Sequence, residues 1–460
     1  MRVKVKNLGA LVQAEFSLGN FTIICGGNNM GKTYATYALF GFLHTWHEVM
    51  SIDVADHIVK DLFDDGAVSI DLSDYVKNAE NILASACQVY TKKLPDVFSA
   101  QKEMFKDSSF ELFIANEKLT LDRSFERKIR AANTELFVLT KDENSEMLLV
   151  SLLVDKENVQ LPSGMIRQVI SNVISEIIFS EQLPSPFIAS AERTGAAIFR
   201  NELNFARNRL LEELRQSNKN VNPIELLMKS SNDYALAVEE NVDFTRQLEN
   251  ISKNTSQIAE EAPDILKNFA DIIGGDYEVT RNDELYFKPK GSKVKLTMDA
   301  SSSAVRSLLD IGFYLRHVAK RGDLLMVDEP ELNLHPENQR RVARLFARLV
   351  HFGIKIFFTT HSDYITKELN TLVMLNSDQA YLKEIAQEEG YLPEEFMSAD
   401  KIRVYIAEIQ LIHVDGMKKR VSRPTLVSAK IDPDMGIEAR SFDETIETMN
   451  RIQEAIVWGQ

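Results

Sequence analysis

The sequence predicts an α/β fold built on a mixed sheet, and three observations lead to this prediction. A glycine-rich loop at residues 26–33 lies between an apolar run at 21–25 and a helix-compatible segment at 34–46. Two further apolar runs, at 324–327 and 354–359, end in polar residues and are followed by helical patterns. Short apolar runs of this kind are typical of strands buried in a parallel sheet. The alternation of strand and helix therefore favours a sheet covered by helices.

The glycine-rich loop matches the pattern G-x-x-x-x-G-K-[ST] at every fixed position. Its glycines allow the backbone to curl so that successive N–H groups point at phosphate oxygens, and the following helix contributes its positive N-terminus. We expect Lys32 to contact the β- and γ-phosphates of a nucleotide and the Thr33 hydroxyl to hold Mg²⁺. The residues expected to bind the nucleotide here are Gly26, Asn28, Asn29, Gly31, Lys32 and Thr33.

Carboxylates follow the second apolar run, and a histidine follows the third. Asp328 and Glu329 come directly after residues 324–327, and His361 lies just beyond 354–359. The carboxyl ends of parallel strands meet at one edge of a sheet, where ligands bind. We expect Asp328 to hold Mg²⁺ and Glu329 to orient or deprotonate an attacking water, while His361 contacts the γ-phosphate or holds that water. A helix-capping pair is the alternative for the two carboxylates, and the nearby phosphate loop disfavours it.

The chain is expected to divide into four parts. Residues 1–195 form the N-terminal half of a nucleotide-binding head with insertions. Residues 196–275 form a helical arm or lobe, because apolar residues recur three or four apart, as at 198–216. Residues 276–395 form the C-terminal half of the head and begin with an antiparallel meander. Residues 396–460 form a small α+β module that ends in an amphipathic helix.

The composition excludes several classes of protein. Of the 460 residues, 44% are hydrophobic and 26% are charged, which is typical of a soluble globular protein. No apolar run approaches the ~20 residues that span a bilayer, and the start has no secretory signal, so we expect a cytoplasmic protein without a membrane partner. Two cysteines, Cys25 and Cys87, provide neither a disulfide framework nor a metal cluster. A net charge of −15 argues against nucleic-acid binding over the whole surface but leaves a local basic patch possible.

The order of these motifs resembles that of ABC-type ATPases of the RecF, SMC and OLD kind. A phosphate loop is followed by a serine-rich helix start at 300–303, an apolar strand ending in Asp-Glu-Pro at 328–330, and a strand ending in Thr-Thr-His-Ser at 359–362. The resemblance covers residues 1–45 and 295–375. It implies an ABC-type P-loop ATPase head that binds ATP and Mg²⁺ and hydrolyses ATP to ADP and phosphate.

In that family, signature serines bind the γ-phosphate of the ATP held by the other protomer. Ser301, Ser302 and Ser303 stand at the corresponding place, without the usual signature glycines. Residues 332–335 match the dimer-contact loop, so the resemblance implies a head-to-tail dimer around ATP. Residues 192–193, Glu and Arg, resemble an acid–arginine segment of OLD-like ATPases.

Within this group, the short helical arm excludes a long-armed SMC protein. The β-rich tail resembles stand-alone ATPases of bacterial anti-phage defence systems, such as those of Septu, PARIS and some retrons, which pair with a separate nuclease or other effector. The implied function is a sensor or scaffold whose ATP-driven dimerisation controls such an effector. The alternative is a RecF-like DNA-repair ATPase that clamps duplex DNA. A self-contained nuclease with carboxylates at 432 and 434 is disfavoured, because such metal sites need several carboxylates on a packed sheet.

Overall fold

The computed structural model describes residues 1–131, 134–154, 162–200, 234–280, 284–416, 419–433, 435–438 and 440–458. Their contacts divide the chain into two units, which are described separately. The first contains Met1–Lys4, Phe42–Lys93 and Ser109–Pro184, and the second contains Val5–Gly41, Leu94–Ser108 and Ser185–Gln460. All the residues expected to bind nucleotide lie in the second unit. The four domain boundaries expected from the sequence stay a prediction.

The first unit is built on an antiparallel sheet. Its four strands have the order β4-β8-β7-β6. These strands are β4 (Ala67–Asp71), β6 (Phe125–Ala131), β7 (Thr134–Lys141) and β8 (Met147–Leu152). The unit also contains strand β5 (Ser109–Phe113) and helices α2 (Asp56–Asp65), α3 (Ser73–Lys77) and α5 (Ser163–Phe179), and most of α4 (Ala79–Val97).

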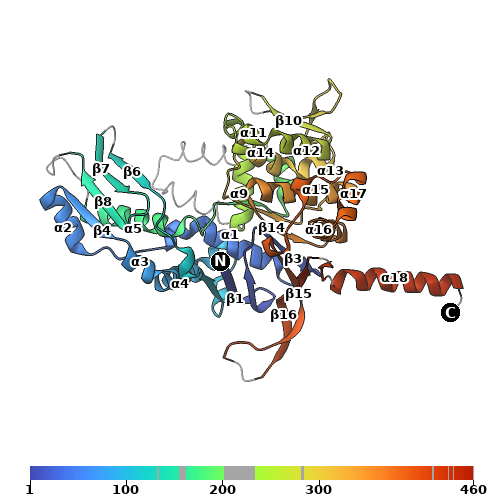
Figure 1. The fold of residues 1–460 in the computed structure, drawn as a ribbon, viewed down its shortest axis with the longest axis horizontal. Helices are drawn as coiled ribbons and strands as arrows, with labels where there is room; N and C mark the ends of the chain where they lie inside the picture. The colour runs from blue at the N-terminus through green and yellow to red at the C-terminus, as the bar shows by residue number, and fades with distance from the viewer. Residues whose placement is uncertain are drawn as a thin grey trace, which may run out of the picture. The chain divides into compact units, whose positions relative to one another are not determined.

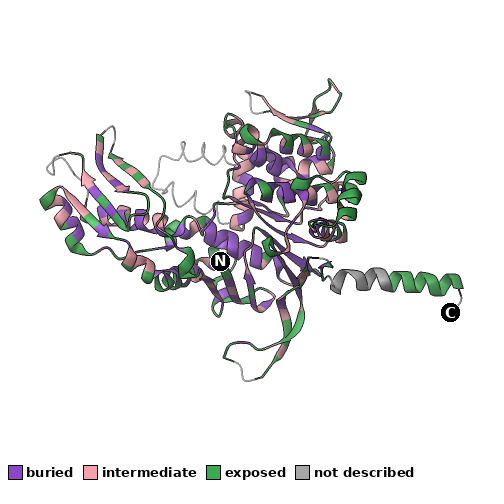
Figure 2. Ribbon diagram, in the orientation of Figure 1, coloured by how far each residue is buried: buried purple, intermediate pink, exposed green. Residues whose placement is uncertain are grey.

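The second unit contains a six-stranded sheet in the order β16-β15-β3-β14-β13-β9 (Figure 1). Five of these strands run parallel, and β16 runs antiparallel to β15, so the expected α/β fold with a mixed sheet is confirmed. The strands are β3 (Phe21–Gly26), β9 (Pro186–Ala189), β13 (Leu324–Asp328), β14 (Lys355–Thr360), β15 (Ile402–Ile412) and β16 (Val421–Ser428). Every residue of β3 and β13 is buried, which explains their apolar sequences (Figure 2).

Helices pack against this sheet through their apolar faces and form the main core with it. They include α12 (Pro263–Ile273), α14 (Leu309–His317), α15 (Pro336–Phe352) and α16 (Asp363–Met374). Pro336 starts α15, where its missing N–H costs nothing. Ser362 caps α16 by accepting a hydrogen bond from the Ile365 N–H at 3.2 Å. Both helices start shortly after a strand of the sheet ends: α15 follows β13, and α16 follows β14.

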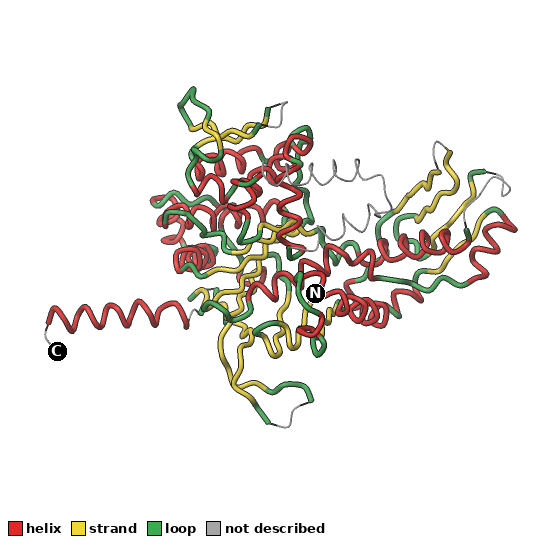
Figure 3. Tube along the Cα trace, turned by 180° about the vertical axis from the view of Figure 1, so that it is seen from behind, coloured by secondary structure: helices red, strands yellow, loops and turns green. Residues whose placement is uncertain are grey.

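The segment expected to form a helical arm is described in part. It contains α6 (Arg193–Ile198), α9 (Leu236–Arg246), α10 (Leu248–Ile251) and α11 (Gln257–Glu261). The helix expected at 198–216 lies mostly outside the described residues. The expected meander follows as β10 (Gly275–Val279), β11 (Leu285–Pro289) and β12 (Leu296–Thr297), which pair antiparallel (Figure 3).

The C-terminal segment is joined to the head by strand pairing. In β15, residues Ile402 to Ala407 pair in parallel with Phe21 to Gly26 of β3. Beyond the β15–β16 hairpin follow two short strands, β17 (Ile431–Asp432) and β18 (Gly436–Ile437), and then α18 (Arg440–Trp458). Asp432 accepts a hydrogen bond from the Met435 N–H at 3.0 Å, which is the geometry of a turn.

The other strands and α-helices of the described residues follow. They are the strands β1 (Arg2–Leu8) and β2 (Leu11–Ser17), and the helices α1 (Lys32–Val49), α13 (Ser303–Ser307) and α17 (Ala380–Glu388). Among the described residues, no helix has both the length and the apolar character that crossing a membrane requires.

The first prediction concerns the contact between β3 and β15. Gly26 has φ 132°, and a Cβ atom there would lie 2.4 Å from the Ala407 carbonyl oxygen. We expect Gly26→Ala to lower the free energy of unfolding by about 2–5 kcal/mol, because left-handed strain adds to overpacking. Gly390 is a matched control, since it has φ 70° but no atom within 4 Å of the place that a Cβ atom would take. Gly390→Ala should cost only about 1–2 kcal/mol in urea unfolding. Equal losses would contradict the tight β3–β15 contact.

Candidate functional site

The loop between β3 and α1 has a curled backbone that only certain residues allow. Gly26, Asn29 and Gly31 have φ values of 132°, 62° and 91°. A Cβ atom on Gly31 would lie 2.5 Å from Leu11 Cγ, so glycine is required there. Lys32 begins α1 and is 6% exposed, whereas Asn28, Asn29 and Thr33 are exposed. The loop therefore presents its polar groups around a buried lysine.

Lys32 connects this loop with the end of β14. Its Nζ donates to the carbonyl oxygens of Gly26 at 3.0 Å and Gly27 at 2.8 Å, and it lies 2.9 Å from His361 Nε2. Burial lowers the pKa of Lys32, while the nearby carboxylates, first among them Glu329, act in the opposite direction. The end of β14 thus meets the phosphate loop at this ammonium group. The roles expected of Lys32 and His361 toward a nucleotide stay a prediction.

Asp328 lies at the buried end of β13 and is 2% exposed. It is paired in register with Thr359 of β14, whose Oγ1 donates to Asp328 Oδ1. The other oxygen, Oδ2, is buried and has no hydrogen-bond partner among the described residues. Burial raises the pKa of Asp328, whereas the Thr359 hydroxyl and Arg193 act to lower it. A buried carboxylate oxygen without a protein donor is suited to a cation.

The oxygen donors of this region fit a magnesium ion. Asp328 offers its free carboxylate oxygen, and the exposed Thr33 hydroxyl lies at the start of α1. Across the described ranges, no group of three or more His, Cys, Asp or Glu side chains could hold a metal ion. Mg²⁺ typically takes one or two protein ligands and completes its shell with substrate phosphates and water, so this sparse donor set is compatible with it.

Glu329 has a left-handed backbone with φ 53°, which is uncommon for this residue type. Its N–H donates to Thr359 Oγ1 at 3.2 Å. Its Oε1 lies 3.3 Å from His361 Nε2, and the side chain is 31% exposed. The carboxylate therefore borders both solvent and His361, which is a suitable place for a group that handles a water molecule.

The backbone of His361 is held by a carboxylate for which the sequence alone predicts no role. Its backbone N–H donates to Glu331 Oε1 at 2.6 Å. Burial and the charge of Lys32 lower the pKa of His361, which favours the neutral ring, although Glu329 opposes this. Burial raises the pKa of Glu331. Glu331 stands three positions after Asp328, but its contact is with a residue thirty positions away on the next strand, so no local pattern in the sequence indicates it.

The serines expected to act as a signature element lie at the start of α13. Ser302 caps that helix and accepts from the Val305 N–H at 3.3 Å. Ser301 is buried and donates to the Thr297 carbonyl at 2.8 Å, whereas Ser302 is exposed. In the part of the chain that the structure describes, none of the three serines is hydrogen-bonded to Lys32, Asp328 or Glu329. Their expected role toward ATP held by a second protomer stays a prediction.

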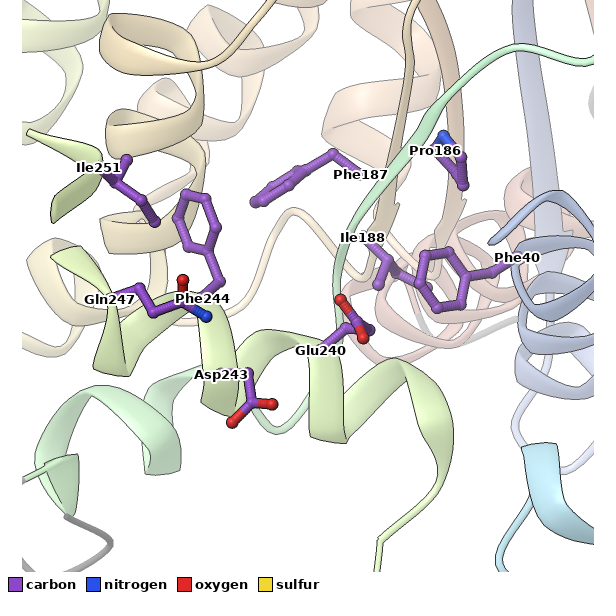
Figure 4. A pocket seen from close by; sticks show the side chains of 9 residues that line it. All are labelled: Phe40, Pro186, Phe187, Ile188, Glu240, Asp243, Phe244, Gln247 and Ile251. Carbon is purple, nitrogen blue, oxygen red and sulfur yellow. The ribbon is translucent and has the colours of Figure 1, made fainter. Parts of the chain in front are cut away.

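A separate cavity of about 150 Å³ lies beside the edge strand β9 (Figure 4). Phe40, Phe187 and Phe244 line it together with the carboxylates of Glu240 and Asp243. None of the residues expected to bind nucleotide or to catalyse its hydrolysis lines this cavity, so it is distinct from the phosphate-binding loop.

The buried Asp328 gives the second prediction. Its pKa is raised above 3.8 in the folded state, so ionisation as the pH rises destabilises the folded protein relative to the unfolded chain. The uncharged Asp328→Asn variant lacks this loss. Its free energy of unfolding minus that of the wild type should therefore increase as the pH rises above about 4.

Chemical unfolding at several pH values measures this difference. Asp378→Asn is the control, because the exposed Asp378 has a pKa that Lys383 lowers, which gives a small slope of opposite sign. A difference for Asp328→Asn that shrinks as the pH rises would show that Asp328 is not destabilised by ionisation.

Comparisons with known proteins identify a family for most of the chain. A family model described as "AAA ATPase domain" matches residues 1–366, which contain the phosphate loop, Asp328, Glu329 and His361. No curated protein matches the chain. Similar solved structures include an SMC head bound to the C-winged helix domain of ScpA, with 13% identity and a TM-score of 0.33 over 93% of this chain and 97% of that chain. The SMC head domain from Thermotoga maritima has 10% identity and a TM-score of 0.30 over 94% and 98%.

Structural likeness at these TM-scores adds nothing to the assignment, which rests on the family match and on the site. The match covers most of the chain, and the residues that it spans supply a phosphate loop, a strand-end Asp-Glu pair and a strand-end histidine. The chain belongs to the AAA ATPase domain family.

Proposed function

We propose that this protein binds ATP with Mg²⁺ and hydrolyses it to ADP and phosphate. One observation carries the proposal. Lys32 Nζ, His361 Nε2 and Glu329 Oε1 form a continuous chain of contacts of 2.9 Å and 3.3 Å. The buried, half-satisfied carboxylate of Asp328 belongs to the same group of strand ends. These are the groups that phosphoryl transfer to water needs: a cation for the phosphates, a metal ligand and a base.

Each group then has a role that follows from its surroundings. The loop N–H groups and Lys32 bind the phosphates, and Thr33 and Asp328 hold Mg²⁺. Bound Mg²⁺ neutralises the charge that develops on the phosphate oxygens. Glu329 accepts a proton from the attacking water, because its partly exposed carboxylate can reach solvent. His361, whose ring is favoured as neutral, orients that water or the γ-phosphate from the end of β14.

We further propose that two copies dimerise head-to-tail around ATP. The exposed Ser302 at the start of α13 is available to a nucleotide from outside its own protomer. The loop at 332–335, which resembles the dimer-contact loop of ABC-type ATPases, lies between Glu331 and α15 and contains the exposed, left-handed Asn333. ATP hydrolysis would then separate the protomers.

At the cellular level, we propose that this ATP-dependent dimer controls a separate effector, such as a nuclease, in anti-phage defence. The support is the resemblance of the motif order and of the β-rich tail to the stand-alone ATPases of such systems. Clamping of duplex DNA by a RecF-like dimer is the competing outcome of the experiment described below.

The third prediction tests nucleotide binding. Lys32→Met should weaken ATP binding by about 10- to 100-fold, because a hydrogen-bonding cation facing the phosphates is lost. Isothermal titration calorimetry with Mg²⁺ and ATP measures the affinity. Lys290→Met is the control, since Lys290 is an exposed lysine of the same unit that is paired with Asp271. Unchanged ATP affinity in Lys32→Met would refute the phosphate-loop assignment.

The fourth prediction tests hydrolysis and dimerisation. Glu329→Gln should lower kcat by about 100-fold or more while ATP still binds, since only the base is removed. Light scattering after gel filtration should then show an ATP-dependent dimer. Glu337→Gln, which alters an exposed carboxylate in α15, should hydrolyse ATP like the wild type. Normal turnover in Glu329→Gln would exclude Glu329 as the base, and an ATP-bound monomer would exclude the proposed dimer.

The trapped Glu329→Gln protein also identifies the partner. Affinity purification from the native host with ATP, followed by mass spectrometry and nucleic-acid analysis, separates the two functions. A stoichiometric effector protein, absent from parallel Lys32→Met samples, supports effector control. Duplex DNA without a protein partner supports the DNA-clamping alternative and contradicts effector control.

A further inference from the structure

Arg193 is a buried cation in the site, and the function proposed above assigns it no role. The side chain is 1% exposed and is among the largest fully buried side chains of the described residues. Burying a guanidinium is costly unless its N–H groups are hydrogen-bonded. Arg193 meets this condition with short bonds to main-chain carbonyls. A buried arginine with these contacts is a fixed connection between the segments that it joins.

The carbonyls belong to separate elements of the second unit. Nε donates to Ser307 in α13 at 2.7 Å, and Nη1 donates to Ser190, just after β9, at 2.7 Å. Nη1 also donates to the backbone carbonyl oxygen of Asp328 at 2.7 Å, and Nη2 donates to the backbone carbonyl oxygen of Glu329 at 2.8 Å. The same guanidinium therefore bonds to the serine-bearing helix and to the peptides of both expected catalytic-site carboxylates.

The bond to Glu329 acts on a strained peptide. Glu329 has φ 53°, a conformation that costs a residue with a side chain about 1–2 kcal/mol. Its N–H is held by Thr359 of β14 and its carbonyl by Arg193. With both ends of the residue fixed, the direction of its Cα–Cβ bond, from which the side chain starts, is fixed as well. Movement of Arg193 would therefore change where the Glu329 carboxylate points.

The other side of Arg193 is held by the helices that follow the serines. α6, which begins with Arg193, packs on α13. Asp310, at the start of α14, is 1% exposed. Burial raises its pKa to about 7, although Arg193 opposes the rise, so above that pH its negative charge acts on Arg193. Asp310 Oδ1 accepts from Thr245 Oγ1 at 3.0 Å, and its Oδ2 has no hydrogen-bond partner within the described chain. A displacement of α13 would thus act on Arg193 through the Ser307 carbonyl, and a displacement of α14 would act on it through the Asp310 carboxylate.

We infer that Arg193 is a positioning residue that couples the serine-bearing helix α13 to the peptide of Glu329. This inference rests on the proposed function, in which the serines of one protomer contact ATP held by the other. Engagement of α13 at the partner's nucleotide then sets the direction of Glu329 in its own protomer. The two ATP sites of the dimer are linked in this way, with one Arg193 in each protomer.

The fifth prediction tests this coupling. Arg193→Lys keeps the positive charge, but one ammonium cannot span carbonyls that a planar guanidinium reaches together. ATP affinity by calorimetry should stay within about threefold of the wild type, while kcat should fall by about 100-fold, as for a misplaced catalytic group. In an Arg193→Lys, Glu329→Gln double variant, the ATP-dependent dimer should still form. The double variant thus separates assembly from the positioning of Glu329.

A second variant and a control keep the inference testable if Arg193→Lys does not fold. Asp310→Asn retains the shape of the side chain and, above about pH 7, removes the charge that acts on Arg193. In assays above that pH, kcat should therefore fall by a smaller factor with unchanged ATP affinity. Asp323→Asn is the control. Asp323 accepts from the Tyr314 hydroxyl at 3.1 Å and the Lys320 N–H at 2.8 Å, just before β13 and away from Asp328. It should leave kcat unchanged.

The outcomes are distinguishable. Wild-type turnover by both Arg193→Lys and Asp310→Asn, with normal ATP binding, overturns the inference and leaves the proposed function intact. A parallel fall of bound ATP and turnover, with a matching fall in melting temperature, also overturns it, because that pattern indicates a purely structural arginine. A wild-type protein that neither binds nor hydrolyses ATP overturns the proposed function and this inference together.

Discussion

The parallel register of β3, β14 and β13 is the constraint on which the site depends. Asp328 is opposite Thr359, and Thr360 is opposite Cys25, one position before the phosphate loop begins. Side chains alternate between the two faces of a sheet, so a shift of one residue in any strand would turn Asp328 or Thr359 to the other face. The apolar residues buried along these strands resist such a shift, because it would bring the whole run out of register with its neighbours. Core packing and the geometry of the candidate site are thus set by the same pairing.

This arrangement concentrates charge where little water can reach it. Burial lowers the pKa of Lys32 and raises those of Asp328 and Glu331, so each group on its own would favour its neutral form. Arg193 opposes this tendency for Asp328, and the carboxylates oppose it for the cations Lys32 and Arg193. The groups therefore maintain one another's charge. Removal of a single member alters the protonation of the others as well as its own contact.

The sequence predicts the groups that we propose for the chemistry better than the groups that position them. The phosphate loop, Asp328, Glu329 and His361 are recognisable because each stands beside a glycine-rich turn or at the end of an apolar run. Glu331 and Thr359 gain their roles only from contacts with residues about thirty positions away on a neighbouring strand, and a local pattern carries no information on such contacts. Arg193 stands out in the sequence only through a family resemblance. Its function in the site depends on carbonyl groups, which every residue has.

The order of strands was likewise beyond the reach of the sequence. Residues 402–412 are recognisable as a strand, yet nothing local places them beside β3, because strand neighbours are chosen by the packing of the whole sheet. The predicted mixed sheet is confirmed, because β16 pairs antiparallel with β15 while the other strands run parallel.

The position of β15 has a consequence for the biosynthesis of the protein. β3 and the phosphate loop leave the ribosome long before the strand that covers one side of β3. Until β15 emerges, the nascent chain presents an apolar strand with one unpaired edge, and Gly26 at the start of the phosphate loop lacks the strand on which it packs. A ribosome that stops before residue 402 releases a chain that contains every motif of the site but lacks the strand against which its loop is packed. Such a chain would expose the unpaired edge of β3 to chaperones and proteases. A stable head therefore requires synthesis to continue through β15.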